Sequence, residues 1–277
     1  MSLVNGFPQD TIELSDRGLQ YGDGLFETIA IKKGHPCFLN RHLARLNEGC
    51  RRLLLPEYCS TVLYNEAISM SKGLENAVLK IIITRGSGGR GYRQPEMINP
   101  NRILSTHPFP NYSSTYKEQG VCVRLCETRL GLNPTLARIK HLNRLEQVLA
   151  RAEWSNLNFQ EGIMLDLNDH VIEGTMTNLF YTKNNKLFTA PLQYSGVAGI
   201  MREIIIELAR THGYTVILEN FNLSDLLSAD EAFVCNSIIG IWPINSINST
   251  SLEIGLITRQ LQYMISRYEY EDIISNL

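Results

Sequence analysis

The chain has 277 residues, of which 44% are hydrophobic and 19% charged, and its formal net charge at pH 7 is −2. This composition is typical of a folded globular protein and excludes a disordered chain or a strongly basic nucleic-acid-binding protein. At about 150 residues per domain, the length predicts two domains. No signal-like segment opens the chain and no apolar run reaches the roughly 18 residues of a membrane span, so we expect a cytoplasmic protein without a membrane partner.

The first half of the chain alternates strand-like and helix-like segments. β-branched or apolar runs predict strands at 25–31, 77–84 and 102–107. Helical periodicity predicts a helix at 41–55 with Asn40 as its N-cap and Pro56 beyond its end, and a second helix at 60–72.

Residues 108–118 contain two prolines and mostly polar residues, which is typical of a linker. We therefore expect a small α/β domain over 1–112, a linker over 113–119 and a larger domain over 120–277. Strands mixed with helices, and hairpins mixed with crossovers, predict an α+β (mixed α/β) fold.

The second half begins with a predicted strand at 120–126 and a predicted helix at 138–153, in which Ile139, Leu142, Leu145 and Leu149 have helical spacing. A meander is expected over 162–190. The remaining predictions, in order, are a helix from Gly199 to Gly213, a strand at 214–219, a short helix at 223–228, a strand at 232–237, a loop at 238–244 and a helix at 250–268.

Lysine is scarce, with 8 residues against 18 arginines, so each lysine can be considered in turn. Only Lys80 and Lys140 have apolar neighbours on both sides, and a desolvated lysine can act as a nucleophile or base. For Lys80 the alternative is a side chain that reaches solvent from a sheet edge. Lys140 lies where a strand-like segment meets a helical one, a location that favours catalytic groups. The cysteines and histidines show no metal-ligand spacing, so we expect no metal site.

Three further features suit a cofactor that bears a phosphate and an aldehyde. Gly199 precedes a helix, so the backbone N–H groups of Ile200 and Met201 can bind an anion. Arg45 can bind a phosphate through two hydrogen bonds, and Glu173 can keep a pyridine nitrogen protonated. The alternatives are an ordinary helix start, a solvated helix face and an exposed turn glutamate.

Taken together, the sequence resembles the class IV (fold type IV) pyridoxal-phosphate enzymes. That family includes branched-chain aminotransferases, D-amino acid transaminases and aminodeoxychorismate lyase, and the resemblance to the lyase is strongest. The blocks that carry it are YGDGLFET (21–28), RHLARL (41–46), RGSGGRGY (85–92), IKHLNRLEQVLA (139–150), EGTMTNLF (173–180), GIMRE (199–203) and ADEAFVCNSIIGIWPI (229–244).

The resemblance implies a pyridoxal 5'-phosphate cofactor, a barrel-like sheet in the larger domain and a homodimer. It makes Lys140 the lysine that binds the cofactor covalently and takes up the substrate proton. Glu173 would contact the ring nitrogen, and Val197 would support the ring. The phosphate ligands would be Arg45, Ile200, Met201 and Ser237.

Two positions favour the lyase, which converts 4-amino-4-deoxychorismate to 4-aminobenzoate and pyruvate in folate biosynthesis. Thr28, a catalytic candidate, follows the Phe-Glu pair where the aminotransferases tend to have Gly or Val. Arg144 stands where they often carry Tyr. We expect Arg90 and Tyr92 to bind substrate carboxylates. The alternatives are an aminotransferase for branched-chain or D-amino acids, and a cofactor-free nucleotide-binding module that uses the glycine-rich loop, although that loop lacks the P-loop ending.

Overall fold

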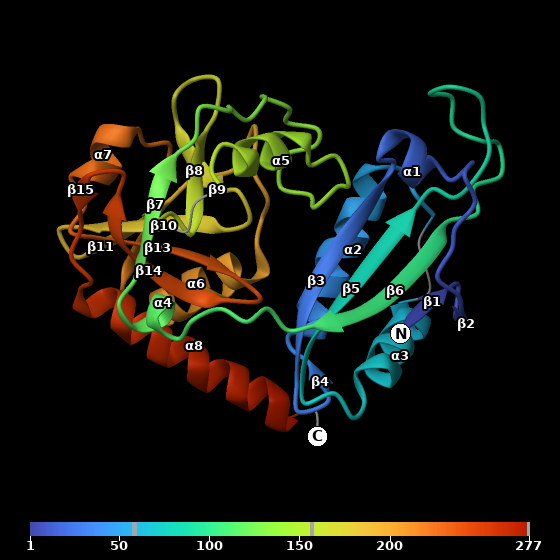
Figure 1. Ribbon diagram of the computed structural model, residues 1–277, viewed down its shortest axis with the longest axis horizontal. Helices are drawn as coiled ribbons and strands as arrows, with labels where there is room; N and C mark the ends of the chain where they lie inside the picture. The colour runs from blue at the N-terminus through green and yellow to red at the C-terminus, as the bar shows by residue number, and fades with distance from the viewer. Residues whose placement is uncertain (57–59, 156–157, 276–277) are drawn as a thin grey trace. The chain divides into compact units, whose positions relative to one another are not determined.

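The computed structural model describes residues 1–56, 60–155 and 158–275, and the chain forms two compact units (Figure 1). Unit 1 comprises Met1–Pro110, Ile139–Asn143 and Glu269–Leu277, and unit 2 comprises Asn111–Arg138 and Arg144–Tyr268. The expected division placed all of 120–277 in the second domain, whereas two short pieces of that range join unit 1. The mixed α/β fold is confirmed.

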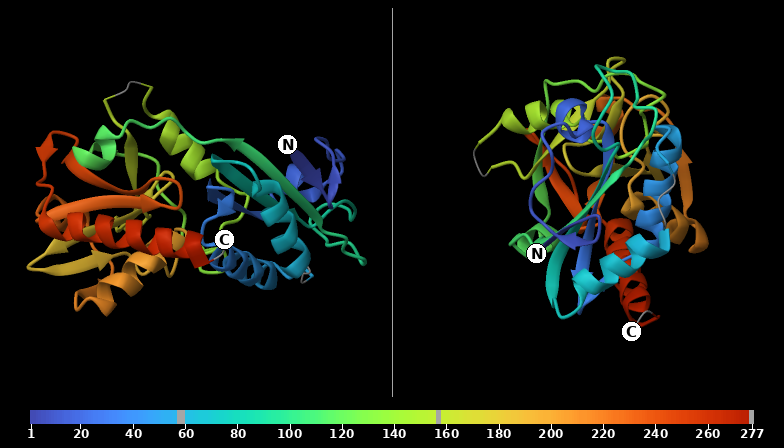
Figure 2. Two further views of the ribbon diagram at one scale, coloured as in Figure 1. Left: turned by 90° about the horizontal axis from the view of Figure 1, so that it is seen from below. Right: turned by 90° about the vertical axis from the view of Figure 1, so that its right-hand side faces the viewer.

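Unit 1 is built on an antiparallel six-stranded sheet in the order β2-β1-β6-β5-β3-β4. One face of β3 and β5 presents buried residues such as Leu25, Ile29 and Leu79, and helices α2 and α3 contact these strands (Figures 1 and 2). The strands are β1 (Ser2–Val4), β2 (Phe7–Pro8), β3 (Gly24–Lys32), β4 (His35–Pro36), β5 (Asn76–Thr84) and β6 (Asn101–Pro108), and the helices are α1 (Arg17–Tyr21), α2 (Leu39–Arg52) and α3 (Ser60–Ser71).

Helix α2 does not begin at the predicted cap. It starts at Leu39, after Phe38, whose φ is +55°, so Asn40 lies inside the first turn. The backbone N–H of Phe38 donates to Asp272 Oδ2 over 2.8 Å. The group at this helix start therefore comes from the far end of the chain, and local sequence could not indicate it.

Unit 2 contains a nine-stranded sheet that closes on itself. Strand β9 pairs with both β8 and β10, so β10, β13, β14, β7, β8 and β9 form a closed barrel, which confirms the expected barrel-like sheet. A buried apolar cluster that includes Val121, Ile163 and Val234 forms its core. The strands are β7 (Val121–Leu125), β8 (Glu161–Leu165), β9 (Val171–Gly174), β10 (Asn178–Lys183), β11 (Lys186–Thr189), β12 (Thr215–Leu218), β13 (Glu231–Asn236), β14 (Gly240–Ile247) and β15 (Thr250–Ser251).

The predicted loop at 238–244 is wrong, because most of it belongs to strand β14. This strand pairs with β13 on one side and with β7 on the other. Pro243 within it has no N–H to donate, and the pairing with β7 shifts register between Ile244 and Ser246. Ile241, Trp242 and Ile244 of this strand are buried, and the strand lies inside the sheet although proline is uncommon there.

The predicted helix at 138–153 is also wrong in its first half. Helix α5 covers only Leu145–Ala152, because the backbone groups before it bond to strands and loops elsewhere. The other helices are α4 (Thr115–Glu118), α6 (Ile200–Thr211), α7 (Leu223–Leu227) and α8 (Leu256–Ser275). Helix α8 starts later than predicted, where Glu231 accepts the N–H groups of Ile257 and Thr258. Within the described residues, no helix is both long and apolar enough to cross a membrane.

Candidate active site

Lys140 lies in an extended segment of unit 1 that bonds to β3. Its carbonyl oxygen accepts the N–H of Phe26 over 3.0 Å, and the N–H of Leu142 donates to Gly24 O over 3.0 Å. The Lys140 Nζ lies 4.4 Å from the centroid of the Phe26 ring. Both the main chain and the side chain of this half-buried lysine are therefore fixed by one strand.

Thr28 and Lys80 are paired residues on β3 and β5. The alternative interpretation placed Lys80 at a sheet edge. It does not lie at an edge, because β5 has a strand on either side. Its Nζ lies 5.5 Å from the centroid of the Phe26 ring. The half-buried side chains of Phe26, Thr28 and Lys80 thus share one sheet face, and the period-2 pattern of β3 and β5 could have indicated this.

Arg45 lies on α2 and forms a two-pronged ion pair with a carboxylate that the sequence interpretation overlooked. Its Nε and Nη2 donate to Glu27 Oε1 and Oε2 over 2.8 and 2.5 Å. His42 Nδ1 lies 2.7 Å from the same Oε2. Burial alone would raise the pKa of Glu27, but the charge of Arg45 and the hydrogen bond with His42 outweigh it and lower that pKa to about 2.

Glu173 lies in unit 2 on β9 and is 4% exposed, so it is not an exposed turn glutamate. Its Oε2 accepts the N–H of Val197 over 2.8 Å and the side-chain amide of Asn178 over 3.4 Å. That Asn178 amide also donates to Val197 O over 2.9 Å. Burial lowers the pKa of Arg144, and the negative charge of Glu173 opposes this effect. The motif EGTMTN therefore builds a buried carboxylate that is held by the Val197 N–H and the Asn178 amide.

Val197 is held from a second direction by the segment that precedes Lys140. Arg138 has a φ of +75° and forms a parallel bridge with Val197. The Arg138 N–H donates to Gly196 O over 2.8 Å, and the Ala198 N–H donates to Arg138 O over 3.0 Å. A non-glycine residue in this left-handed conformation is uncommon and is held here by the hydrogen bonds on both sides.

The start of α6 follows Gly199, which has the extended conformation expected of an N-cap. Ile200 and Met201 are buried in its first turn. A Cβ on Gly199 would lie 2.0 Å from Asn178 Oδ1, so this glycine is required by space and not by φ. Ser237 is half-buried in the turn between β13 and β14.

Arg90 and Tyr92 lie in the glycine-rich loop, and both are exposed, Tyr92 to 88%. Arg85 at the start of the loop is buried and pairs with Asp23. Arg17, which sequence reasoning missed, donates through Nη1 to backbone carbonyl groups of the loop, among them Gly91 O at 2.9 Å. These buried arginines therefore hold the loop.

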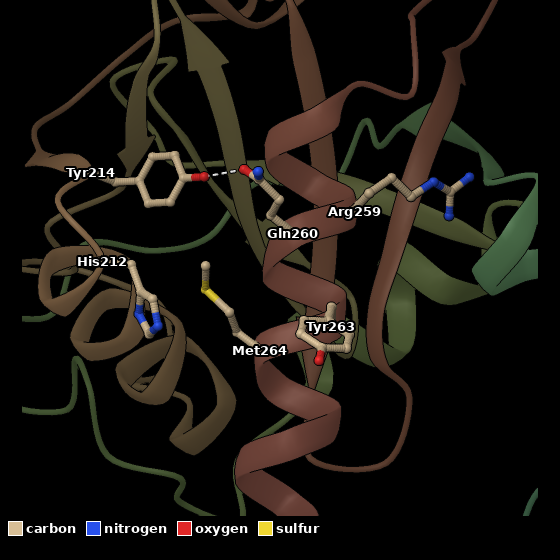
Figure 3. Close-up of a pocket in the computed structure, with 6 residues that line it drawn as sticks. All are labelled: His212, Tyr214, Arg259, Gln260, Tyr263 and Met264. Atoms are coloured by element: carbon tan, nitrogen blue, oxygen red, sulfur yellow. Dashed lines mark hydrogen bonds between the residues drawn. The ribbon is translucent and has the colours of Figure 1, made fainter.

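A separate hollow of about 510 Å³ lies in unit 2, beside α8 (Figure 3). The Tyr214 hydroxyl donates to Gln260 across it. Its lining residues are His212, Tyr214, Arg259, Gln260, Tyr263 and Met264. It contains none of the predicted site residues.

Comparison with known proteins identifies the family. Residues 24–247 match the model for amino-transferase class IV. The chain is 42% identical over 266 residues to an aminodeoxychorismate lyase of Vibrio harveyi, covering 95% of this chain and 98% of the relative. It is 29% identical over 265 residues to a branched-chain-amino-acid aminotransferase of Escherichia coli K12, covering 91% and 85% of the two chains.

A solved structure of 4-amino-4-deoxychorismate lyase from Pseudomonas aeruginosa superposes with a TM-score of 0.93 at 44% identity, and the match covers 96% of this chain and 98% of that one. The predicted family is thus confirmed by sequence and by fold. The chain belongs to the amino-transferase class IV family.

Proposed function

We propose that this chain is a pyridoxal-phosphate-dependent lyase that converts 4-amino-4-deoxychorismate to 4-aminobenzoate and pyruvate. The observation that carries the proposal is the anchored position of Lys140, beside the strand that bears Thr28. The near full-length match to proteins named as this lyase supports the same reaction.

The described residues fit the cofactor. The Glu173 carboxylate is buried and accepts the N–H groups of Val197 and Asn178, and an ionised carboxylate is also the group that would hold a ring nitrogen in its protonated form. The first N–H groups of a helix have no partner within it, so those of Ile200 and Met201 suit a phosphate. Arg45, and Ser237 in the turn between β13 and β14, would be further ligands of the phosphate. When bound, pyridoxal phosphate would supply an electron sink for the carbon that loses its proton.

The chain's own groups would move the protons. Neutral Lys140 would take the proton from the substrate carbon that bears the amine, while Glu173 keeps the ring nitrogen protonated. The Thr28 hydroxyl would pass a proton toward the leaving enolpyruvyl oxygen, and pyruvate would depart as the substrate ring becomes aromatic. Val197, fixed by its hydrogen bonds to Glu173 and Asn178, would support the ring.

The substrate carries two carboxylates, which require cationic or hydrogen-bonding partners. Arg90 and Tyr92 are proposed for this role, and their exposure leaves both side chains accessible. Lys80 adds an ammonium group on the sheet face that carries Thr28. This lysine lies in the middle of a sheet and is half-buried beside an aromatic ring. Because its ammonium group is partly removed from solvent, a substrate carboxylate is a suitable partner for it.

A homodimer is also proposed, on the evidence of α5. This helix buries only Ala150, while Leu145, Val148 and Leu149 are 75%, 60% and 61% exposed. These residues are spaced three and four apart and therefore form one apolar stripe. A second copy of this chain is the partner that would cover it.

A second candidate function is amino transfer, because branched-chain aminotransferases are among the relatives. Both reactions begin with the same proton transfer to Lys140, and the products distinguish them. The purified protein should be supplied with pyridoxal phosphate and aminodeoxychorismate, with and without 2-oxoglutarate. We expect 4-aminobenzoate and pyruvate in both cases. Amino transfer to 2-oxoglutarate without 4-aminobenzoate would contradict the lyase, and a protein with no borohydride-trapped cofactor at Lys140 would contradict both.

A further inference from the structure

A buried carboxylate on β3 joins two side chains of α2. Glu27 and His42 are 1% and 0% exposed, and Arg45 follows His42 by three residues on the same helix face. Glu27 Oε1 accepts Arg45 Nε, and Oε2 accepts both Arg45 Nη2 and His42 Nδ1. Because the carboxylate is ionised, the bond to His42 requires the proton on Nδ1. Both carboxylate oxygens are therefore committed to α2.

Stability alone does not account for this arrangement. A buried ion pair is desolvated on both sides, and apolar residues of similar volume often stabilise a fold as well or better. What the pair supplies is direction, since two parallel hydrogen bonds fix the plane of a guanidinium. Glu27 engages the edge formed by Nε and Nη2, so the remaining N–H groups of Arg45 point away from it. The negative charge of Glu27 offsets the positive charge of Arg45. Arg45 would therefore recognise an anion mainly through directed hydrogen bonds.

We propose that Glu27 and His42 are positioning residues, which hold the Arg45 guanidinium in the orientation that receives the phosphate of pyridoxal phosphate. His42 contributes by orienting the Glu27 carboxylate, and Glu27 by orienting Arg45. A side chain that is ordered before binding loses less conformational freedom when the phosphate arrives. This inference rests on the proposed function, in which Arg45 is a phosphate ligand.

The test compares two ligands that differ only in the phosphate. The dissociation constants of pyridoxal phosphate and of pyridoxal should be measured by absorbance titration of the full-length apoprotein. Glu27→Gln should weaken binding of pyridoxal phosphate by about tenfold, the size seen for residues that orient ligand-binding side chains, and change binding of pyridoxal by less than about twofold. In an Arg45→Ala background, the same Glu27→Gln change should have no further effect on either ligand.

The same helix offers a matched control. Glu48 makes an equivalent two-pronged pair with Arg51, at 2.7 and 2.8 Å, but both side chains are exposed. Glu48→Gln should leave both dissociation constants unchanged. If Glu27→Gln does not fold, as judged by thermal unfolding, His42→Gln takes its place and should give a smaller loss, about threefold, confined to pyridoxal phosphate.

Equal weakening for both ligands, or an effect of Glu27→Gln that persists without Arg45, would show a merely structural role and overturn the inference. The premise has its own readout. If Arg45→Ala leaves the ratio of the two dissociation constants unchanged, Arg45 is not a phosphate ligand, and that part of the proposed function fails.

Discussion

The Nζ of Lys140 lies 4.4 Å from the centroid of the Phe26 ring, and the carbonyl oxygen of the same lysine accepts the Phe26 N–H. One residue of β3 thus fixes both ends of the lysine. Charged ammonium groups favour the face of an aromatic ring, and the backbone bond sets the direction in which the side chain leaves the chain. Phe26 precedes Glu27 and Thr28, so one short stretch of β3 contacts Lys140, orients Arg45 and carries the proposed catalytic hydroxyl.

Replacement of Lys140 should abolish both cofactor attachment and turnover. Lys140→Ala should lower the lyase rate by at least about 10²–10⁴-fold, the contribution of a positioned proton-transfer group. Borohydride treatment followed by peptide mapping should find the trapped cofactor at Lys140 in the unmodified protein and at no lysine in the variant. Lys72→Ala, which removes an exposed lysine at the end of α3, should leave both results unchanged. A trapped adduct at Lys80 would show that the lysine has been wrongly assigned.

The sequence predicts the strands of this fold better than the segment that carries its central lysine. Apolar spacing over 138–153 is typical of a helix, yet Ile139 is buried in a segment that bonds to β3, and α5 begins only at Leu145. Helical spacing cannot reveal that Arg138 adopts a left-handed φ and bonds to Gly196. Contacts with residues far away in the sequence, Gly196 on one side and Gly24 and Phe26 on the other, decide this segment, and local periodicity carries no information about them.

The candidate site shows a similar limit. Lys140, Arg45 and Glu173 could be singled out from residue type and family resemblance, because their chemistry suits the cofactor. The groups that orient them, Glu27 for Arg45 and Asn178 for Glu173, could not. Glu27 is a buried glutamate in a strand and Asn178 an asparagine paired with Glu173, and neither has a distinctive sequence spacing. Their roles depend on which helix or loop packs against them.

Gly199 should not tolerate even one added methyl group. A Cβ there would lie 2.0 Å from Asn178 Oδ1, and that side chain also bonds to Val197 and Glu173. Gly199→Ala should therefore displace the amide and weaken pyridoxal phosphate binding by about tenfold, with a stability loss of about 1–3 kcal/mol from overpacking. Absorbance titration and urea unfolding measure the two effects.

Gly213→Ala is the matched control for Gly199→Ala. Gly213 has a φ of +85° and nothing within 4 Å of its added Cβ. The strain should cost about 1–2 kcal/mol of stability and leave cofactor affinity unchanged. If both variants lose affinity alike, the contact with Asn178 is not the cause.

The Glu27 network should make stability depend on acid pH. The folded-state pKa of Glu27 is about 2, below its ordinary value of 4.5, so its stabilising effect is present above pH 4.5 and is lost as the pH falls toward 2. The corresponding change in the free energy of unfolding is about 3 kcal/mol. Burial lowers the pKa of His42, so the unfolded chain takes up that proton first and stability also begins to fall below about pH 6.5.

Urea unfolding from pH 8 to pH 3 tests this. Glu27→Gln should be less stable than the unmodified protein at pH 7, because Arg45 loses its charged partner, and the two curves should converge as the pH falls. Parallel curves would show that Glu27 does not titrate with a lowered pKa. His42→Gln should remove only the part of the slope near pH 6.5.

The apolar stripe on α5 should govern assembly. Leu149→Lys places a charge within the exposed face formed with Leu145 and Val148, and an ammonium group cannot be buried there without a partner. Sedimentation velocity at micromolar concentration should show a dimer for the unmodified chain and a monomer for this variant. Leu256→Lys, at an equally exposed leucine at the start of α8, should remain dimeric. If the dimer survives Leu149→Lys, or if it also dissociates with Leu256→Lys, α5 does not form the interface. A specific interface must respond to a charge placed on its own surface and not to one placed elsewhere.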